Sequence, residues 1–216
     1  MDLKDKLAVV TGGARRLGLA IVEELQDRGA RVVVHYHRSE PEARELCRRT
    51  GAVALAADLS RPEGARDLAD QVLALGTPPA VWVNSAAAFT RADILDGDEA
   101  LWLETLQLVL LSPATLARRL APHMPQGAVI INLLDLAARK PWRGYAHHCV
   151  AKAGLEMLTR CLALELAPRV RVCGVAPGLV LPAEEMTEEQ LRRLEARTPL
   201  GRRGEPGDVA RAVRFL

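Results

Sequence analysis

The amino-acid sequence predicts an α/β protein with one doubly wound parallel sheet in a single domain. Three observations lead to this prediction: short apolar, β-branched runs alternate with helical patterns, most of these runs are apolar throughout, and a glycine-rich turn follows the first of them. Strands that are apolar on both faces suit a parallel sheet covered by helices on each side. Repeated strand–helix units with right-handed crossovers then predict the spatial strand order 3-2-1-4-5-6.

Six apolar runs are long enough to serve as strands. The segment from about 179 to 207 has the least strand character and the most charge. We expect it to form an excursion over the carboxyl-terminal edge of the sheet, where ligands bind in this architecture. The domain is predicted to span residues 1–216, with strands at residues 7–10, 31–36, 52–57, 81–84, 128–133 and 170–175.

Helix boundaries are also predicted by the sequence. The first helix follows from the apolar stripe Leu17, Ile21 and Leu25, and we expect it to end at Gly29, a typical C-terminal cap. Further helices are expected to begin at capping boxes, in which a Ser or Thr precedes a Glu or Gln by three positions. These boxes are Ser39-x-x-Glu42, Ser60-x-x-Glu63 and Thr187-x-x-Gln190.

Composition limits the class of protein and its partners. The 216 residues are 49% hydrophobic, which suits one well-buried core. A net charge of +2 gives no reason to expect a nucleic acid or a membrane as partner, and no apolar run approaches the roughly 20 residues that span a bilayer. The acidic start of the chain does not resemble a signal peptide. Four scattered cysteines favour free thiols in a reducing cytosol over zinc or disulfides, so we expect a cytoplasmic protein.

A glycine-rich turn at residues 11–18 (TGGARRLG) connects the first strand to the first helix. Glycines at such a turn let the backbone approach a pyrophosphate, and the helix N-terminus offers free N–H groups. A dinucleotide-binding motif requires this context of a preceding strand and a following helix. A plain tight turn is the alternative interpretation.

The end of the second strand, residues 35–39 (HYHRS), indicates which dinucleotide would bind. An NAD site usually carries an acid there to hold the ribose hydroxyls, and this strand end has none. Arg38 could instead pair with a 2′-phosphate, and Arg16 in the glycine turn could reach the same group. The motif therefore favours NADP(H), with a solvated basic patch as the alternative.

With these motifs the sequence resembles the short-chain dehydrogenase/reductase family over essentially its whole length, and it is most similar to pteridine reductases. ADLS at 57–60, VAPGLV at 175–180 and PLGRRGEPGDVA at 199–210 match family segments. VNSAAAF at 83–89 stands where pteridine reductases have Asn-Asn-Ala-Ser-Ser-Phe. The resemblance implies a Rossmann-type fold in which Asp58 meets the adenine amino group and the Pro177-Gly178 turn holds the nicotinamide end.

The cofactor site implied by the resemblance combines the glycine turn, the basic strand end and positions at the sheet edge. We expect NADP(H) as the cofactor and no metal. The expected cofactor-binding residues are Gly12, Arg16, Leu17, Gly18, His37, Arg38, Ser39, Asp58, Leu59, Asn84, Ala86, Lys152, Pro177 and Gly178.

The expected catalytic centre departs from the family pattern. The family carries Tyr-x-x-x-Lys on one helix, where the lysine holds the nicotinamide ribose and helps the tyrosine exchange a proton with substrate. Lys152 matches the lysine, but His148 occupies the tyrosine position. Histidine is a competent acid–base, with an unperturbed pKa near ~6.5. Tyr145 lies seven residues before the lysine, and we expect it to pack near the helix start.

Two further residues of the pteridine reductase pattern are retained. Asp135 stands where those enzymes carry an aspartate, and the resemblance implies that it lies beside a pterin ring and takes part in proton delivery. Phe89 could sandwich the pterin against nicotinamide. The alternative for Asp135 is a carboxylate that only caps a turn, and the alternative for Phe89 is ordinary core packing. The predicted catalytic residues are therefore Asp135, His148 and Lys152, and the predicted substrate-binding residues are Phe89 and Asp135.

Two functions stay open because other polar family positions are altered, to Ser85, Ala87, Ala88, Val109 and Cys173. The first is an NADPH-dependent reductase of a pterin or folate-like ring. The second is a catalytically impaired, NADP(H)-binding pseudoenzyme or partner subunit. The survival of the predicted catalytic lysine, aspartate and ring-stacking phenylalanine favours the reductase.

The resemblance also bears on assembly. Family members normally add one more strand after the last helix, and residues up to Leu216 do not include it. That strand usually supports tetramer contacts, so we expect a homo-oligomer and leave open whether it is a dimer or a tetramer.

Overall fold

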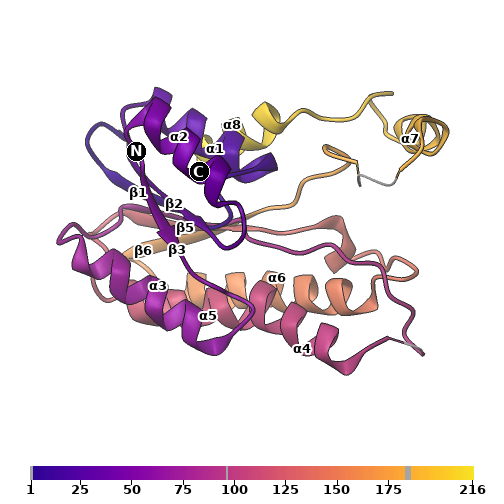
Figure 1. Ribbon diagram of the computed structural model, residues 1–216, viewed down its shortest axis with the longest axis horizontal. Helices are drawn as coiled ribbons and strands as arrows, with labels where there is room; N and C mark the ends of the chain where they lie inside the picture. Colours follow the sequence, from indigo (N-terminus) through magenta and orange to yellow (C-terminus); the bar gives the residue numbers. More distant parts are fainter. Residues whose placement is uncertain (1, 96, 183–185) are drawn as a thin grey trace.

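The computed structural model describes residues 2–95, 97–182 and 186–216, and its sheet confirms the predicted fold. Six strands form one parallel sheet in the predicted order, β3-β2-β1-β4-β5-β6 (Figure 1). In this register Val9 of the first strand lies between Val33 and Trp82 of its two neighbours. The strands are β1 Leu7–Val10, β2 Arg31–Tyr36, β3 Val53–Ala56, β4 Val81–Asn84, β5 Ala128–Leu133 and β6 Val170–Val175.

Helices cover both faces of the sheet, which explains why its central strands are apolar throughout. Strands β1, β4 and β5 are buried along their whole length, and an apolar core lies on each side of them. One helix layer contains α1 Arg16–Asp27, α2 Glu40–Thr50 and α8 Pro206–Phe215, and the other contains α3 Pro62–Ala74, α4 Glu99–Leu106, α5 Ser112–Leu120 and α6 Ala146–Leu166 (Figure 1).

The predicted helix boundaries are met in part. Gly29 ends α1 as expected, with a φ of +86°. The capping box at Thr187 is present at the start of α7, Glu188–Glu195. The boxes predicted at Ser39 and Ser60 are wrong: the Ser39 side chain makes no capping hydrogen bond, and α3 begins at Pro62 after Arg61. The reason at Ser60 is that its hydroxyl and its backbone N–H both donate to the nearby carboxylate of Asp58.

The segment expected to leave the body of the domain, residues 179–207, contains α7. None of the residues of this helix is buried, and it lies apart from the two helix layers (Figure 1). Residues 183–185 of the segment lie outside the described residues.

One continuous helical stretch, residues 99–120, is long and apolar enough by length and composition to cross a membrane. It comprises α4, a π-helical turn Gln107–Leu111, and α5. Gln107 and Ser112 are buried in it, and the Ser112 hydroxyl donates to the carbonyl of Leu59 at 2.7 Å. Polar side chains that bond inward are typical of a helix packed within a folded domain.

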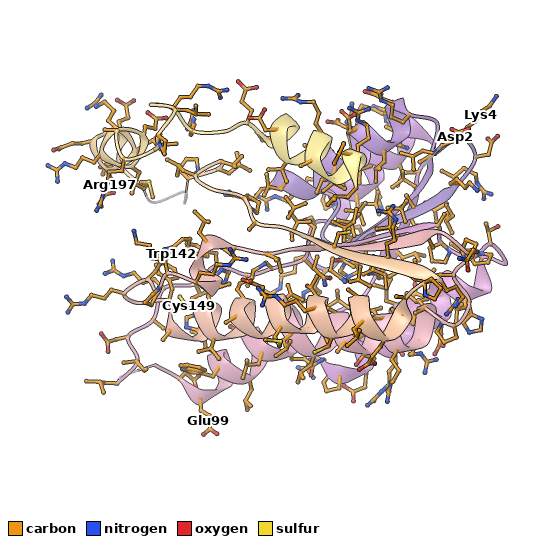
Figure 2. All side chains as sticks on the ribbon, turned by 180° about the vertical axis from the view of Figure 1, so that it is seen from behind. Asp2, Lys4, Glu99, Trp142, Cys149 and Arg197 are labelled. Atoms are coloured by element: carbon orange, nitrogen blue, oxygen red, sulfur yellow. The ribbon has the colours of Figure 1, made fainter. Side chains whose placement is uncertain are left out.

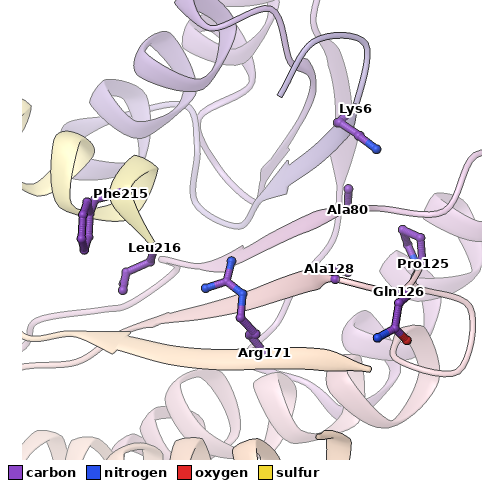
Figure 3. A pocket seen from close by; sticks show the side chains of 9 residues that line it. Lys6, Ala80, Pro125, Gln126, Ala128, Arg171, Phe215 and Leu216 are labelled. Atoms are coloured by element: carbon purple, nitrogen blue, oxygen red, sulfur yellow. The ribbon is translucent and has the colours of Figure 1, made fainter. Parts of the chain in front are cut away.

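The two edges of the sheet differ in what they carry. The glycine turn and the loops after β4 and β5 follow the carboxyl ends of adjacent strands and so meet at one edge. At the opposite edge lies a hollow of about 550 Å³, beside the amino ends of β1, β4, β5 and β6 (Figure 3). The lining of this hollow includes none of the predicted site residues: it consists of Lys6, Ala80, Pro125, Gln126, Gly127, Ala128, Arg171, Phe215 and Leu216.

Candidate functional site

The glycine turn packs tightly against its own helix and against the loop after β4. Gly12 has a φ of +63°, and a Cβ added there would lie 2.9 Å from the Cα of Ala86. A Cβ added to Gly18, in the first turn of α1, would lie 2.1 Å from the carbonyl oxygen of Gly12. Both contacts are closer than real Cβ atoms tolerate, so these positions require glycine. The turn therefore presents its backbone N–H groups at a helix start, a typical site for anion binding.

Thr11 fixes the position of the glycine turn relative to the neighbouring strand, and the sequence analysis did not assign it a role. Its buried hydroxyl accepts hydrogen bonds from the backbone N–H groups of Ser85 and Ala86, at 3.0 and 3.1 Å. The same hydroxyl lies 3.4 Å from the carbonyl of Val83, to which it donates. Its place directly before the glycines is the only sequence signal that could have indicated this role.

His35 is a second residue at this edge that the sequence analysis did not single out. Its ring is buried, and Nδ1 accepts a hydrogen bond from the Gly12 backbone N–H at 3.1 Å. Burial lowers the pKa of His35 to about 4. A neutral, buried imidazole therefore holds the backbone of the glycine turn by a hydrogen bond.

The basic strand end lies beside the predicted adenine-binding carboxylate. His37 and Arg38 are exposed after β2, and Nδ1 of His37 lies 3.6 Å from Oδ1 of Asp58. Burial would raise the pKa of Asp58, but hydrogen bonds from Ser60 and the charges of His37 and Arg61 together hold it below its ordinary value. This carboxylate is therefore ionised at neutral pH.

Arg16 connects the glycine turn to the segment that follows β6. Its guanidinium donates to the carbonyl of Pro182 at 3.2 Å, although the two residues are far apart in sequence. Pro177 and Gly178 precede this contact on the same segment and are half-buried and exposed, respectively. The predicted cofactor residues of β1, β2, β3 and β6 therefore gather at one edge of the sheet.

Asn84 lies at this edge, but its side chain is used within the protein. Its Oδ1 accepts from the Trp82 indole N–H and its Nδ2 donates to Oδ1 of Asn132, both at 2.8 Å. Asn132 in turn donates to the hydroxyl of Thr159 at 2.8 Å. This buried network joins β4, β5 and α6.

Asp135 and His148 form a hydrogen-bonded pair between the loop after β5 and α6. Nε2 of His148 lies 3.2 Å from Oδ2 of Asp135, and Oδ1 of Asp135 accepts from the Ala137 backbone N–H at 2.9 Å. Burial would raise the pKa of Asp135, but these two hydrogen bonds and the nearby charges of His148 and Lys152 hold it below its ordinary value. The aspartate caps a turn and also binds the histidine, so the two interpretations of this residue are compatible.

The remaining nitrogen of His148 has a different environment. The residue is only 2% exposed, and its Nδ1 has no hydrogen-bond partner within residues 2–95, 97–182 and 186–216. An ionised Asp135 fixes the hydrogen on Nε2, which leaves a lone pair on Nδ1 in the neutral ring. A buried polar atom without a partner is rare in a folded protein and is expected where a ligand supplies the missing bond.

Lys152 lies one helical turn after His148 and is also buried. Its ammonium donates to the carbonyl of Leu133 at 2.6 Å. Burial lowers the pKa of Lys152 to about 8, and the charge of Asp135 acts in the opposite direction. The side chain is therefore a cation at neutral pH that loses its charge in mildly alkaline solution.

Aromatic side chains surround the exposed side of the pair. Phe89 stacks on Tyr145, with ring centroids 4.3 Å apart, and meets the ring of His148 edge-on at 5.1 Å. Phe89 is 48% exposed, so the alternative of ordinary core packing is wrong. Tyr145 lies at the start of α6, as expected.

Trp142 completes this aromatic group. Its ring lies 6.1 Å from that of Phe89, and its backbone N–H contacts the sulfur of Cys149 at 3.4 Å. Trp142 and Cys149 mark this end of the molecule, opposite the end that carries Asp2 and Lys4 (Figure 2).

Val109 lies in the π-helical turn that packs against α6. It is 1% exposed and belongs to an apolar cluster with Ala151 and Leu155. The turn has an unusual geometry that is frequent at functional sites, yet this position offers no polar group toward the lysine. The contact between the two helices is therefore purely apolar here.

Comparison with known proteins agrees with this fold. A family profile described as enoyl-(acyl carrier protein) reductase matches residues 12–216. The 3beta-hydroxysteroid dehydrogenase 1 of Eggerthella lenta is 34% identical over 230 residues, which cover 100% of this chain and 87% of that relative.

Solved structures are similar over the whole chain. FolM alternative dihydrofolate reductase 1 from Brucella canis, complexed with NADP, has a TM-score of 0.92 at 32% identity and covers 100% of this chain and 88% of its own. A blue fluorescent protein from a metagenomic library, in complex with NADPH, has a TM-score of 0.93 at 29% identity. The match covers 100% of this chain and 92% of that protein's chain.

The contact between Gly18 and Gly12 leads to a first prediction. We expect Gly18→Ala to lower the free energy of unfolding by about 1–3 kcal/mol, because the added methyl group meets backbone atoms that have no space to move. Urea denaturation measures this change. Gly207→Ala is the matched control, since its Cβ would meet only the flexible end of Arg211 and alanine favours a helix. Equal stability of Gly18→Ala and wild type would contradict the tight packing of the turn.

Proposed function

Because the chain belongs to the short-chain dehydrogenase/reductase family, we propose that this oxidoreductase uses NADPH to reduce a pterin or folate-like ring. The observation that carries the proposal is the pairing of Asp135 with His148 next to the buried Lys152, at the edge that also carries the glycine turn. This arrangement unites an acid–base group, a cation and an anion-binding turn.

The proposed cofactor residues fit NADPH in chemistry as well as in position. The glycine turn offers backbone N–H groups to the diphosphate, and Arg38 with His37 offers positive charge to a 2′-phosphate. When bound, NADPH would supply the hydride for the reduction. Similar structures that contain NADP or NADPH support this choice.

We propose that His148 moves the proton and that Asp135 sets its tautomer. The ionised Asp135 accepts from Nε2, so a protonated His148 can release its other proton only through Nδ1. The aspartate also stabilises the imidazolium form by its charge. This division of roles favours His148 over Asp135 as the proton donor, because the pKa of Asp135 lies below its ordinary value and the carboxylate carries no proton at neutral pH.

A flat aromatic substrate suits the side chains around this pair. Phe89 has one face on Tyr145 and is half exposed, so it offers apolar surface beside His148. The similarity to FolM alternative dihydrofolate reductase 1 supports a pterin or folate-like ring as substrate. In the proposed complex Phe89 contacts the ring and Asp135 lies at its edge.

A second candidate function rests on Val109 and His148. Val109 offers no polar group, and the Lys152 ammonium has only the Leu133 carbonyl as its hydrogen-bond partner among the described residues. A protein that binds NADP(H) without reducing a substrate, as a pseudoenzyme or partner subunit, would fit this loss. Assays of NADPH oxidation with dihydropterins, dihydrofolate and simple ketones distinguish the two functions.

We further propose that the protein is a cytoplasmic homo-oligomer built from single domains, residues 1–216, with the segment 179–207 on the substrate side. Apolar side chains on the outer face of α4, the π-helical turn and α6 support self-association, because they are largely exposed and two of these helices pack side by side. They are Leu103, Leu111, Val150, Met157 and Leu164. The four free cysteines support a reducing compartment.

The basic strand end predicts a preference for the phosphorylated cofactor. We expect tighter binding of NADPH than of NADH, and we expect Arg38→Glu to reduce the preference about tenfold or more, because a charge-assisted hydrogen bond contributes roughly 1.5–3 kcal/mol. Titration calorimetry with both cofactors measures the ratio. Arg31→Glu, at the other end of β2, is the control and should leave it unchanged. Equal affinity for the two cofactors in wild type would rule out the assignment.

The position of Phe89 predicts a selective effect on the substrate. We expect Phe89→Ala to raise the KM for dihydropterin about tenfold, because a contact between aromatic rings contributes roughly 0.5–1.5 kcal/mol beyond the buried area. The affinity for NADPH should stay the same. Phe215→Ala removes an exposed ring that lies outside the proposed site and serves as the control. If pterins and folates fail to bind the NADPH complex at millimolar concentration, the substrate class is wrong.

The hydrogen-bonded pair predicts how catalysis depends on pH. A reductase that uses His148 as its acid needs the protonated ring, so its activity falls as pH rises, and His148→Phe should lower turnover about 10²- to 10⁴-fold. Asp135→Asn should also lower it, since an amide stabilises the imidazolium less. A separate loss near pH 8 that persists in His148→Phe would belong to Lys152.

Steady-state kinetics between pH 5 and pH 9 provide this test, with the exposed His123→Phe as the control. A flat profile together with normal turnover of His148→Phe would exclude His148 as the proton donor. Near-zero activity of wild type with every substrate would favour the pseudoenzyme.

A further inference from the structure

His35 is a buried titratable residue that the proposed reaction does not use. It lies on β2 beneath the glycine turn, with 2% of its surface exposed, and both of its ring nitrogens are bonded. Nδ1 accepts from the Gly12 backbone N–H and Nε2 donates to the carbonyl of Ala57, each at 3.1 Å. Its own carbonyl accepts from the Gly13 N–H at 3.1 Å. One residue therefore holds two glycines of the turn and the end of β3.

These partners determine the protonation state of the ring. A backbone N–H can only donate, so Nδ1 must keep its lone pair, and a carbonyl can only accept, so Nε2 must carry the hydrogen. The ring is therefore neutral. A doubly protonated ring would direct a second N–H at the N–H of Gly12, and this hydrogen bond would be lost.

The charges around the ring oppose protonation on balance. Burial has the largest effect on the pKa of His35 and lowers it to about 4, while the bond to Ala57 acts in the opposite direction. The remaining charged groups that act on the ring are His37, which lowers the pKa further, and Asp58, which raises it. The neutral ring thus persists well below neutral pH.

The two segments that the ring joins both belong to the proposed cofactor site. Gly12 is confined on one side by the backbone of Ala86 and on the other by His35, so the ring limits the positions open to the turn. Ala57 directly precedes Asp58, the residue expected at the adenine. The ring lies beneath these backbone segments and can act on a ligand without touching it.

We propose that His35 is a positioning residue for the cofactor, whose neutral ring accepts from Gly12 and so holds the glycine turn in the shape that binds NADP(H). This inference rests on the proposed function, because it requires that the chain binds the dinucleotide. Acid that protonates the ring frees the turn, so cofactor affinity and the stability of the fold decline over the same range of pH.

Two substitutions separate the two hydrogen bonds of the ring. His35→Asn keeps an oxygen near the position of Nδ1 and can still accept from Gly12, whereas His35→Gln keeps a nitrogen near the position of Nε2 and can still donate to Ala57. We expect His35→Gln to weaken NADP⁺ binding about tenfold or more at pH 7 and His35→Asn to stay within about threefold of wild type. The exposed His123→Asn is the control. Titration calorimetry gives the affinities.

A second readout needs no cofactor. Between pH 6.5 and pH 4 the unfolded chain binds more protons at His35 than the folded chain does, so stability falls as pH falls through this range. The shift of the pKa from 6.5 to about 4 corresponds to an approximately 300-fold loss in the folding equilibrium constant. We expect urea denaturation to show this loss in wild type and to show it reduced in His35→Asn. Nuclear magnetic resonance of wild type should show the Gly12 amide shift together with the ring nitrogens.

The outcomes distinguish the inference from the proposed function. Wild type that fails to bind NADP⁺ overturns both. Wild type that binds, with both variants at wild-type affinity, overturns the inference alone. A ring in wild type that titrates near pH 6.5, or that carries its hydrogen on Nδ1, also overturns it, and this measurement holds even if a variant fails to fold. Selective weakening by His35→Gln supports it.

Discussion

The parallel pairing of all six strands is the constraint on which the site depends. In a parallel sheet every strand ends at the same edge, so segments that are distant in sequence meet there without long loops. The glycine turn after β1, the basic end of β2 and the segment with Asp135 after β5 lie at one edge for this reason. Because both faces of the sheet are covered by helices, this edge is the place where the strands can present polar groups.

The edge carries polar groups that would be costly to bury unpaired, and nearly all of them are bonded within the protein. The hydroxyl of Thr11 and the ring of His35 hold the backbone of the turn. The amides of Asn84 and Asn132 bond to each other within the core. An unsatisfied buried group costs about 1–3 kcal/mol, so such networks fix the edge in one arrangement. Nδ1 of His148 differs from these groups, because it has no hydrogen-bond partner among the residues that the structure describes.

The proposed catalytic centre pairs a histidine with an aspartate that fixes its tautomer. A histidine can serve as acid or base, and in the neutral ring either nitrogen can carry the hydrogen until a partner selects one. Asp135 makes that selection through its hydrogen bond to Nε2, and the charges of His148 and Lys152 help to hold the pKa of Asp135 below its ordinary value. Val109 packs in an apolar cluster with Ala151 and Leu155, next to the lysine in sequence. In the proposed reaction the proton chemistry depends on three side chains from two segments.

The sequence by itself determined the sheet, the strand order and the candidate site residues, because the apolar runs, the glycine turn and the spacing of His148 and Lys152 are local patterns. Tertiary structure decided what local patterns do not contain. Ser60 does not cap a helix, because its hydroxyl donates to the carboxylate of Asp58 instead. The Asn84 amide donates to Asn132 on the neighbouring strand β5. The ring of His35 has its two partners because β2 lies between β1 and β3, and Gly12 and Ala57 follow those two strands. A hydrogen bond between distant segments exists only once the chain has folded, so its partners, its tautomer and its pKa belong to the tertiary structure.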